Sequence, residues 1–213
     1  MDFVADAFEK GGDYMYPILV VSIFVVGIAV ERLVTLFFRA GIDRRSLVDT
    51  LDKLIRHNQI DRAAKLVQNS EAPLARVLRA GLNNYDKDAA TIQLLMDEAA
   101  LVEIPRVEAR TGYLAMLSNV ATLTGLLGTI VGLIHSFAAV ASADAATKST
   151  KLAEGISEAM NCTAFGLVVA VPALVLYAIL TARQHKIVDD LNQATVAVYN
   201  IIRDAKAGIT RPT

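Results

Sequence analysis

Three long uncharged stretches interrupt an otherwise charged chain. They cover residues 14–30, 111–143 and 159–182, and they contain 17, 33 and 24 residues. A helix that crosses a bilayer needs about 20 mainly apolar residues. Helices of a soluble bundle would keep a charged face, so that alternative is the weaker one. The pattern predicts three transmembrane helices, at residues 16–38, 113–141 and 152–182.

The first of these stretches could also be a secretory signal peptide. Its preceding segment, "MDFVADAFEKGGD", is net acidic, whereas a signal peptide begins with basic residues and ends at a small-residue cleavage site. The apolar stretch instead runs on to Phe38 and ends in charges. We therefore expect a retained span over residues 16–38, with Pro17 in its first turn, where a missing N–H is tolerated. Residues 1–15 are expected to form a short segment at the outer surface.

Between the first two spans, residues 39–112 alternate apolar and charged positions at helical period. Asp43 is placed to cap the first of several short helices. Breaks are expected at Asn58, at residues 70–73 and at residues 81–88. The apolar face of the first helix comprises Leu47, Leu51, Leu54 and Ile55. This pattern predicts a small antiparallel helical insert.

A longer helix is predicted to begin near Asp88. Pro105 is expected to kink this helix without ending it, so that the helix runs into the second span with no real break. The C-terminal segment, residues 183–213, is expected to extend the third span as a helix. The apolar positions of the two segments are Ile92, Leu95, Met96, Ala99 and Val102, then Ile187, Leu191 and Val198. The expected fold is an all-α membrane protein.

Lysine and arginine gather on one side of the predicted spans, which marks that side as cytoplasmic. This side carries Arg32, Arg39, Arg44, Arg45, Arg106, Arg110, Arg183 and Lys186. The other side carries Lys10, Lys148 and Lys151. We expect the N-terminus outside and the C-terminus inside a bacterial inner membrane. The loop at 142–151 is then external, and the insert and the C-terminal tail are cytoplasmic.

The composition argues against several classes of function. A net charge of −1 gives no bulk attraction to nucleic acid. The sequence contains no phosphate-binding glycine loop, no HExxH and no CxxC motif, and His57, His135 and His185 are widely dispersed. We expect neither an enzyme, nor a cofactor, nor a metal site. The single cysteine, Cys162, cannot form a disulfide within the chain.

The second and third spans each carry small and polar residues along one helical face. The stripes comprise Ser118, Thr122, Gly125, Thr129, Gly132 and Ser136, then Ala159, Thr163, Gly166, Ala170 and Ala173. Such stripes suit close helix packing, for which Gly128 and Gly132 have a familiar spacing. They would equally suit the lining of a channel. At helical rise, Thr129 and Thr163 lie about 20 and 17 Å below the outer ends of their spans, so both are near mid-membrane, which favours the channel.

Glu158 lies at the outer end of the third span, five residues before Thr163. A carboxylate near hydrocarbon is costly and is a functional candidate, although a solvated acid such as Glu154 remains the alternative. Asn161 continues the same face deeper, and His135 is interpreted as a packing or interface histidine, with a proton role as the alternative. No Asp or Glu occupies the middle of a span. A proton path needs a titratable group in the membrane, so a partner would have to supply it.

Two segments resemble the MotA/TolQ/ExbB proton-channel proteins. "LTGLLGTIVGLIHSF" is similar to their second span, and "GISEAMNCTAFGLVVAVPALVLY" to their third. The third span of the family carries an acid, a Thr five residues on and a Pro nine beyond, which here are Glu158, Thr163 and Pro172. Three spans with the N-terminus outside resemble the ExbB/TolQ branch. The segment "MNCT" is more polar than usual in the family, which leaves a proton or sodium as the transported ion.

The resemblance implies a homopentamer whose central pore holds a dimer of a single-span ExbD/TolR/MotB-like partner with a titrating Asp. It implies pore hydroxyls at Thr129 and Thr163, an outer entrance acid at Glu158 and a bend at Pro172. Thr122 and Asn161 are further candidates for the ion pathway. Packing is assigned to Gly125, Gly128, Gly132 and Gly166.

Such a complex would convert ion flow into work on the cell envelope, through a TonB/TolA-like or motility protein. Outer-membrane uptake, envelope maintenance and gliding remain open as the powered process. A structural membrane scaffold without ion conduction is the alternative, and a stand-alone channel is a third class.

Overall fold

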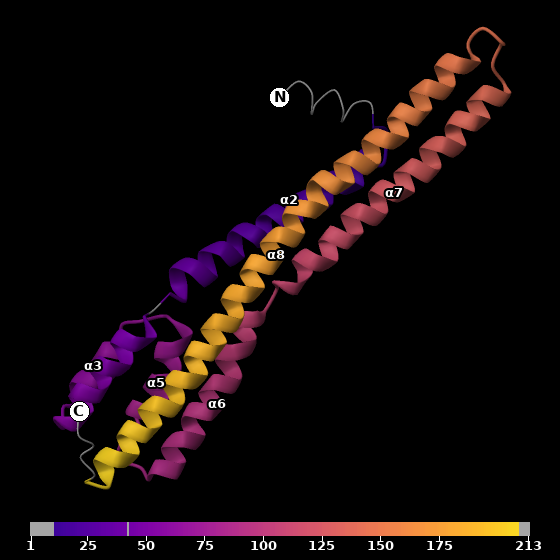
Figure 1. Ribbon diagram of the computed structural model, residues 1–213. Helices are drawn as coiled ribbons and strands as arrows, with labels where there is room; N and C mark the ends of the chain where they lie inside the picture. The colour runs from indigo at the N-terminus through magenta and orange to yellow at the C-terminus, as the bar shows by residue number, and fades with distance from the viewer. Residues whose placement is uncertain (1–10, 42, 209–213) are drawn as a thin grey trace. The chain divides into compact units, whose positions relative to one another are not determined.

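The computed structural model describes residues 11–41 and 43–208, and these residues are helical apart from short connections (Figure 1). Two compact units divide the chain. The span unit contains residues up to 31 and residues 110–179, and the insert unit contains residues 32–109 and 180 onward. The elements are α2 (Met15–Leu33), a π-helical segment η1 (Val34–Arg39), α3 (Arg44–Arg56), α4 (Ile60–Gln68), α5 (Pro73–Leu82), α6 (Ala89–Glu108), α7 (Gly112–Ala141) and α8 (Lys148–Lys206).

Three helical segments are long and apolar enough to cross a membrane, as the hydropathy pattern predicts. The first comprises α2 and most of η1, from Met15 to Phe38. The second includes α7, and the third belongs to α8. The 59-residue α8 is unbroken, so the predicted extension of the third span as a helix is confirmed. The predicted outer-surface segment lies largely on residues 1–10, outside the described residues.

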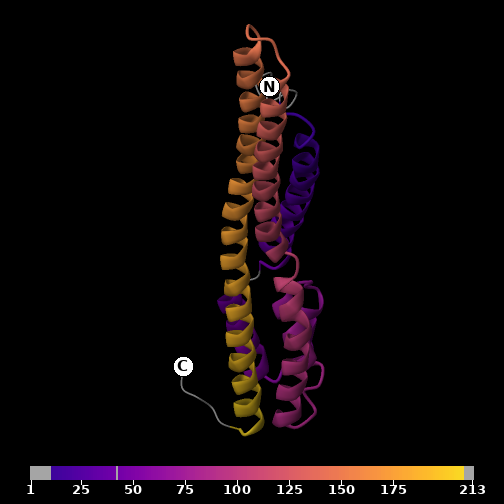
Figure 2. The ribbon, with the colours of Figure 1, turned by 90° about the vertical axis from the view of Figure 1, so that its right-hand side faces the viewer.

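In the span unit, α7 and the first part of α8 run antiparallel and side by side (Figures 1 and 2). Their facing sides are made of small residues, and their large apolar side chains point outward. Leu123 and Ile134, for example, are 63% and 60% exposed. This arrangement suits a bilayer, because leucine side chains can contact apolar lipid tails without a free-energy penalty and close backbone approach stabilises helix pairs. The start of α2 joins the same unit, because Met15 and Ile18 are fully buried against Cys162.

The prediction of an unbroken helix from Asp88 into the second span is wrong. The α6 helix ends at Glu108, Ala109 turns to an extended conformation with ψ 148°, and α7 begins at Gly112. Arg110 adopts a left-handed conformation with φ 64°, which is unfavourable for a non-glycine residue. Its guanidinium bonds to Glu31 at 2.7 Å, a tertiary contact between two partly exposed side chains. Pro105 itself stays within α6, as expected.

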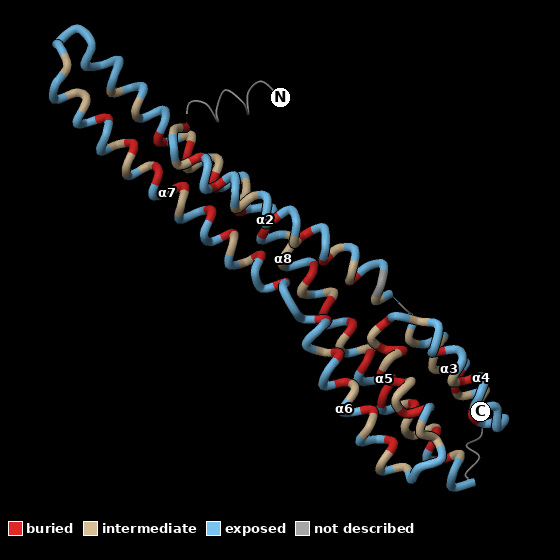
Figure 3. Tube along the Cα trace, turned by 180° about the vertical axis from the view of Figure 1, so that it is seen from behind, coloured by how far each residue is buried: buried red, intermediate tan, exposed pale blue. Residues whose placement is uncertain are grey.

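The insert unit has a conventional apolar core formed by α3 to α6 and the C-terminal part of α8 (Figure 3). The predicted cap is confirmed, because the Asp43 carboxylate accepts the N–H of Arg45 at 3.2 Å. The predicted break at Asn58 is also confirmed, with φ 55°. Val102, one of the apolar residues at helical spacing, is 50% exposed, and the inward positions of that turn are Glu103 and Val107. The predicted apolar positions Ile187, Leu191 and Val198 are buried.

Candidate ion-pathway site

Two threonine hydroxyls meet at the centre of the α7–α8 contact. The Thr129 and Thr163 hydroxyls are hydrogen-bonded to each other. The Thr163 hydroxyl is also 3.1 Å from the carbonyl of Gly125, and the Thr129 hydroxyl lies 3.1 Å from the Gly125 carbonyl and 3.2 Å from that of Ala159. Each hydroxyl has one hydrogen to donate, so the two hydroxyls have more acceptors than hydrogens. The pair can exchange donor and acceptor roles by rotating hydroxyls alone.

Glycines bring the two helices close enough for this contact. A Cβ on Gly125 would lie 3.0 Å from the carbonyl oxygen of Cys162, and one on Gly166 would lie 2.8 Å from that of Ala121. A Cβ on Gly132 would lie 3.2 Å from the Cβ of Ala159. These neighbours belong to backbone or to the first side-chain atom, so they cannot move aside as a flexible side chain could. Gly128 instead lies against Cys162 and Tyr14, where α2 begins.

Most of the remaining stripe residues belong to this packing contact. The buried Ser118 donates to the carbonyl of Ala170 at 2.9 Å, and Ser136 donates to that of Leu152 at 3.4 Å. Both bonds satisfy a hydroxyl that would otherwise lie unpaired in the membrane. Thr122 is exposed and bonds back to Ser118 of its own helix at 3.1 Å. Packing therefore accounts for much of both stripes within one chain, while Thr129 and Thr163 keep half-exposed side chains.

Glu158 is exposed in the first part of α8, and the turn before α2 lies against it. Gly12 has φ 71°, and a Cβ built on it would overlap the Glu158 carboxylate. One turn along α8, the thiol of Cys162 points to the carbonyl of Gly11 at 3.3 Å. The structure thus places Gly12 beside the candidate entrance acid and Gly11 beside Cys162, and neither contact was predicted from the sequence. Their only signal was the pair in "EKGGD" directly before the first span.

The other candidate residues lie apart from the hydroxyl pair. Asn161 is half-buried, whereas Pro172 and His135 are exposed. Pro172 lies within α8, which continues past it. The described part of the chain contains no cluster of three His, Cys, Asp or Glu side chains suited to a metal ion. The spans contain no carboxylate near their middle. Hydroxyls can solvate or relay a cation but cannot store its charge, so this site lacks a titrating group of its own.

Comparisons with known proteins agree with these features. The family model described as the MotA/TolQ/ExbB proton channel family matches residues 69–193. A putative biopolymer transport protein, ExbB-like 3 of Synechocystis sp., is 30% identical over 200 residues, covering 91% of this chain and 94% of that protein. The Tol-Pal system protein TolQ of Haemophilus influenzae is 40% identical over 88 residues, covering 41% of this chain and 38% of that protein.

Among solved structures, that of C. jejuni MotAB matches with a TM-score of 0.61, covering 86% of this chain and 73% of that one. At 19% identity this match establishes similarity of fold. The family model covers more than half of the chain, and the Synechocystis relative aligns over nearly all of it. The chain is a membrane protein and belongs to the MotA/TolQ/ExbB proton channel family, in its ExbB/TolQ-like branch.

Proposed function

We propose that this chain is the ring-forming subunit of an ion-driven motor, with Thr129 and Thr163 in the ion pathway. The observation that carries the proposal is a pair of hydrogen-bonded hydroxyls, with surplus acceptors, in spans that contain no carboxylate of their own. Such a pair can accept a cation from a titrating group and pass it on. The ion is a proton, with sodium as the alternative.

The missing carboxylate is supplied by a partner with a single membrane span and an Asp near mid-membrane. Five copies of this chain form a ring, and a dimer of the partner occupies the pore. The name of the MotAB structure joins two proteins, which supports a complex of this chain with a second protein. The broad apolar faces of α7 and α8 support further helix contacts or lipid contact in the assembled ring.

The complex lies in the bacterial inner membrane, with the N-terminus outside and the insert unit in the cytoplasm. The distribution of Lys and Arg supports this orientation. The relatives are named for biopolymer transport and for the Tol-Pal system, which supports work on the cell envelope as the output. We place outer-membrane uptake first among the processes, followed by envelope maintenance and gliding.

A reconstitution experiment tests the proposal. The chain is co-purified with a short single-span protein encoded by a neighbouring gene and is placed in liposomes. Proton uptake is then measured under an imposed membrane potential. We expect uptake with both proteins and none when the partner's membrane Asp is replaced by Asn. Uptake by the chain alone would instead establish a stand-alone channel.

A structural scaffold is the second candidate, and one specific observation favours it. Ser118, Gly125, Gly132 and Ser136 all face α8 of the same chain and are buried there. If no partner co-purifies and no ion flow occurs under any driving force, the scaffold is the better account. In that case these residues only join helices.

A further inference from the structure

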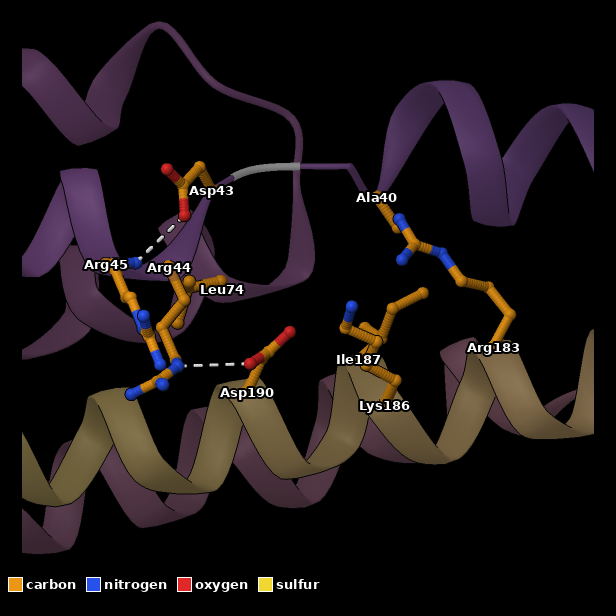
Figure 4. A pocket seen from close by; sticks show the side chains of 9 residues that line it. All are labelled: Ala40, Asp43, Arg44, Arg45, Leu74, Arg183, Lys186, Ile187 and Asp190. Atoms are coloured by element: carbon orange, nitrogen blue, oxygen red, sulfur yellow. Dashed lines mark hydrogen bonds and ion pairs between the residues drawn. The ribbon is translucent and has the colours of Figure 1, made fainter.

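A basic pocket lies in the insert unit, beside the end of the first and third apolar segments. Its cavity volume is about 340 Å³, and its wall is formed by the connection after η1, the start of α3 and α8 (Figure 4). Four of its lining residues are cationic and two are acidic. They are Arg44, Arg45, Arg183 and Lys186, with Asp43 and Asp190. None of them takes part in the proposed ion pathway.

Both acidic side chains of the pocket are already engaged. Asp190 accepts a hydrogen bond from Nε of Arg44 at 3.0 Å, and Asp43 caps α3 through the N–H of Arg45. Among the described residues, neither Arg45 nor Lys186 has a carboxylate partner. Figure 4 shows Arg45 extending beside Arg44 toward α8, with Lys186 and Arg183 on the same helix. The pocket therefore has surplus positive charge, and its natural complement is an anion.

The apolar surroundings of the pocket narrow the choice of anion. Arg183 is the first charged residue after 24 uncharged ones, so it lies where the third span leaves the hydrocarbon. Its Nε donates to the carbonyl of Leu36 at 3.4 Å, and its guanidinium lies 5.3 Å from the centre of the Phe37 ring. The Phe37 side chain is 44% exposed. An exposed phenyl ring beside basic groups suits a molecule with both a phosphate and acyl chains.

We propose that this pocket binds the phosphate headgroup of an anionic phospholipid, with its acyl chains against Phe37. Guanidinium groups bind phosphate oxygens through paired, charge-assisted hydrogen bonds, and basic sites at the end of membrane helices attract anionic headgroups. A free phosphate would use the cations but would make no contact with the phenyl ring. The site would hold a lipid at the side of the membrane that the charge pattern marks as cytoplasmic.

Thermal unfolding of the full chain in neutral detergent tests this proposal. Phosphatidylglycerol, phosphatidylcholine with the same acyl chains, and inorganic phosphate are titrated separately. We expect phosphatidylglycerol to raise Tm at a concentration about tenfold lower than phosphatidylcholine, because each basic residue near an anionic headgroup adds measurable affinity. Inorganic phosphate at matched concentrations should leave Tm unchanged.

Two double variants locate the effect. Arg45→Gln with Lys186→Gln should remove the preference for phosphatidylglycerol. Lys53→Gln with Lys65→Gln removes the same charge from exposed positions of α3 and α4 outside the pocket and should keep the preference. The charge-preserving pair Arg45→Lys with Lys186→Arg should retain most of it.

Several results would overturn the lipid assignment. They are equal responses to both lipids, a preference that survives in the Arg45/Lys186 double variant, or a response to inorganic phosphate alone. If that double variant fails to fold, native mass spectrometry of the unaltered chain with equal amounts of both lipids decides. Retention of phosphatidylglycerol over phosphatidylcholine supports the site, and equal retention refutes it.

Discussion

The Thr129 and Thr163 hydroxyls are hydrogen-bonded to each other, and each also lies 3.1 Å from the carbonyl oxygen of Gly125. This carbonyl belongs to the backbone of α7, and both hydroxyls can donate to it. A cation arriving near the pair would find hydroxyl oxygens that can reorient without moving either backbone. The pair thereby joins two roles, since it stabilises the helix contact and offers oxygen ligands to an ion.

Replacing either threonine by valine tests the second role. We expect Thr129→Val or Thr163→Val to lower partner-dependent proton uptake about tenfold or more, because a hydrogen bond to a charged species contributes about 1.5–3 kcal/mol. Assembly should survive, since valine has nearly the same shape and interhelical hydrogen bonds in membranes average about 0.6 kcal/mol. Uptake is measured in liposomes, and assembly by size-exclusion chromatography.

Thr124 provides the matched control on the same helix. Its hydroxyl bonds only to the carbonyl of Val120, one turn back, at 2.7 Å. Thr124→Val should therefore leave uptake unchanged. Normal uptake in both the Thr129 and Thr163 variants would remove these residues from the ion pathway.

The Gly166 position tests how tightly the two helices must approach. A methyl group there would lie 2.8 Å from the Ala121 carbonyl oxygen, a backbone atom, so Gly166→Ala should force the helices apart. We expect a loss of about 1–3 kcal/mol in stability, typical of overpacking. Gly27→Ala is the control, because a Cβ on Gly27 meets no atom within 4 Å. Unfolding in detergent should give a lower stability for Gly166→Ala than for Gly27→Ala. Equal stabilities would show that the α7–α8 contact can accommodate the added methyl group.

Much of the architecture follows from the sequence because its physical cause is local. Runs of about 20 apolar residues have no stable place except a membrane, so the spans can be recognised without knowledge of tertiary contacts. The short helices of the insert likewise follow from helical periodicity, since Leu51 and Ile55 must find an apolar partner. The cap at Asp43 follows from its side-chain chemistry.

Other features depend on distant contacts and escape such reasoning. The turn at residues 109–111 contains neither glycine nor proline, and Arg110 within it pairs with Glu31, 79 residues away. The approach of Gly12 to Glu158 joins residues that are far apart in the sequence. The stripes raise a further problem, because packing and pore lining demand the same small residues. Ser118 and Gly125 can be assigned to packing because the structure shows their contacts with α8.

Glu158 is predicted to assist ion entry. We expect Glu158→Gln to lower proton uptake severalfold without loss of assembly, because the carboxylate attracts cations toward the outer end of the spans. Glu154→Gln removes the same charge one turn earlier on α8 and should have little effect. Uptake at low and high salt gives a second measure, since electrostatic attraction weakens as salt screens it. Equal uptake in the two variants at low salt would contradict an entrance role for Glu158.

Asp88 is predicted to make the stability of the insert unit depend on pH. Hydrogen bonds from the Thr91 hydroxyl and then from its backbone N–H hold the pKa of Asp88 below the ordinary value of 3.8. The ionised cap therefore stabilises the fold above pH 3.8, and this contribution disappears as the pH falls through the lowered pKa. Asp88→Asn should be less stable than the unaltered chain at pH 7 and equal to it in strong acid. Asp86→Asn, at an exposed position outside the cap, should show no such difference, and a difference for Asp88→Asn that stays constant with pH would contradict the prediction.

Glu103 is predicted to be the most important charged residue for the stability of the insert unit. Its side chain is only 6% exposed, and its carboxylate bonds to Arg106 at 2.6 Å and to Arg76 at 3.2 Å. Glu103→Ala would leave both arginines without this partner and open a gap beside α5. We expect a loss of about 1–3 kcal/mol, because the hydrogen bonds are charged while the arginines remain partly solvated.

Glu71 offers the comparison for Glu103. It also bonds to Arg76, at 2.8 Å, but its side chain is 85% exposed. Exposed ion pairs contribute little, so Glu71→Ala should change stability by less than about 1 kcal/mol. Denaturant unfolding of both variants in the same detergent measures the contrast. If Glu71→Ala proved as destabilising as Glu103→Ala, the burial of Glu103 would not explain its contribution to stability. The two acids would then stabilise Arg76 equally despite their different exposure.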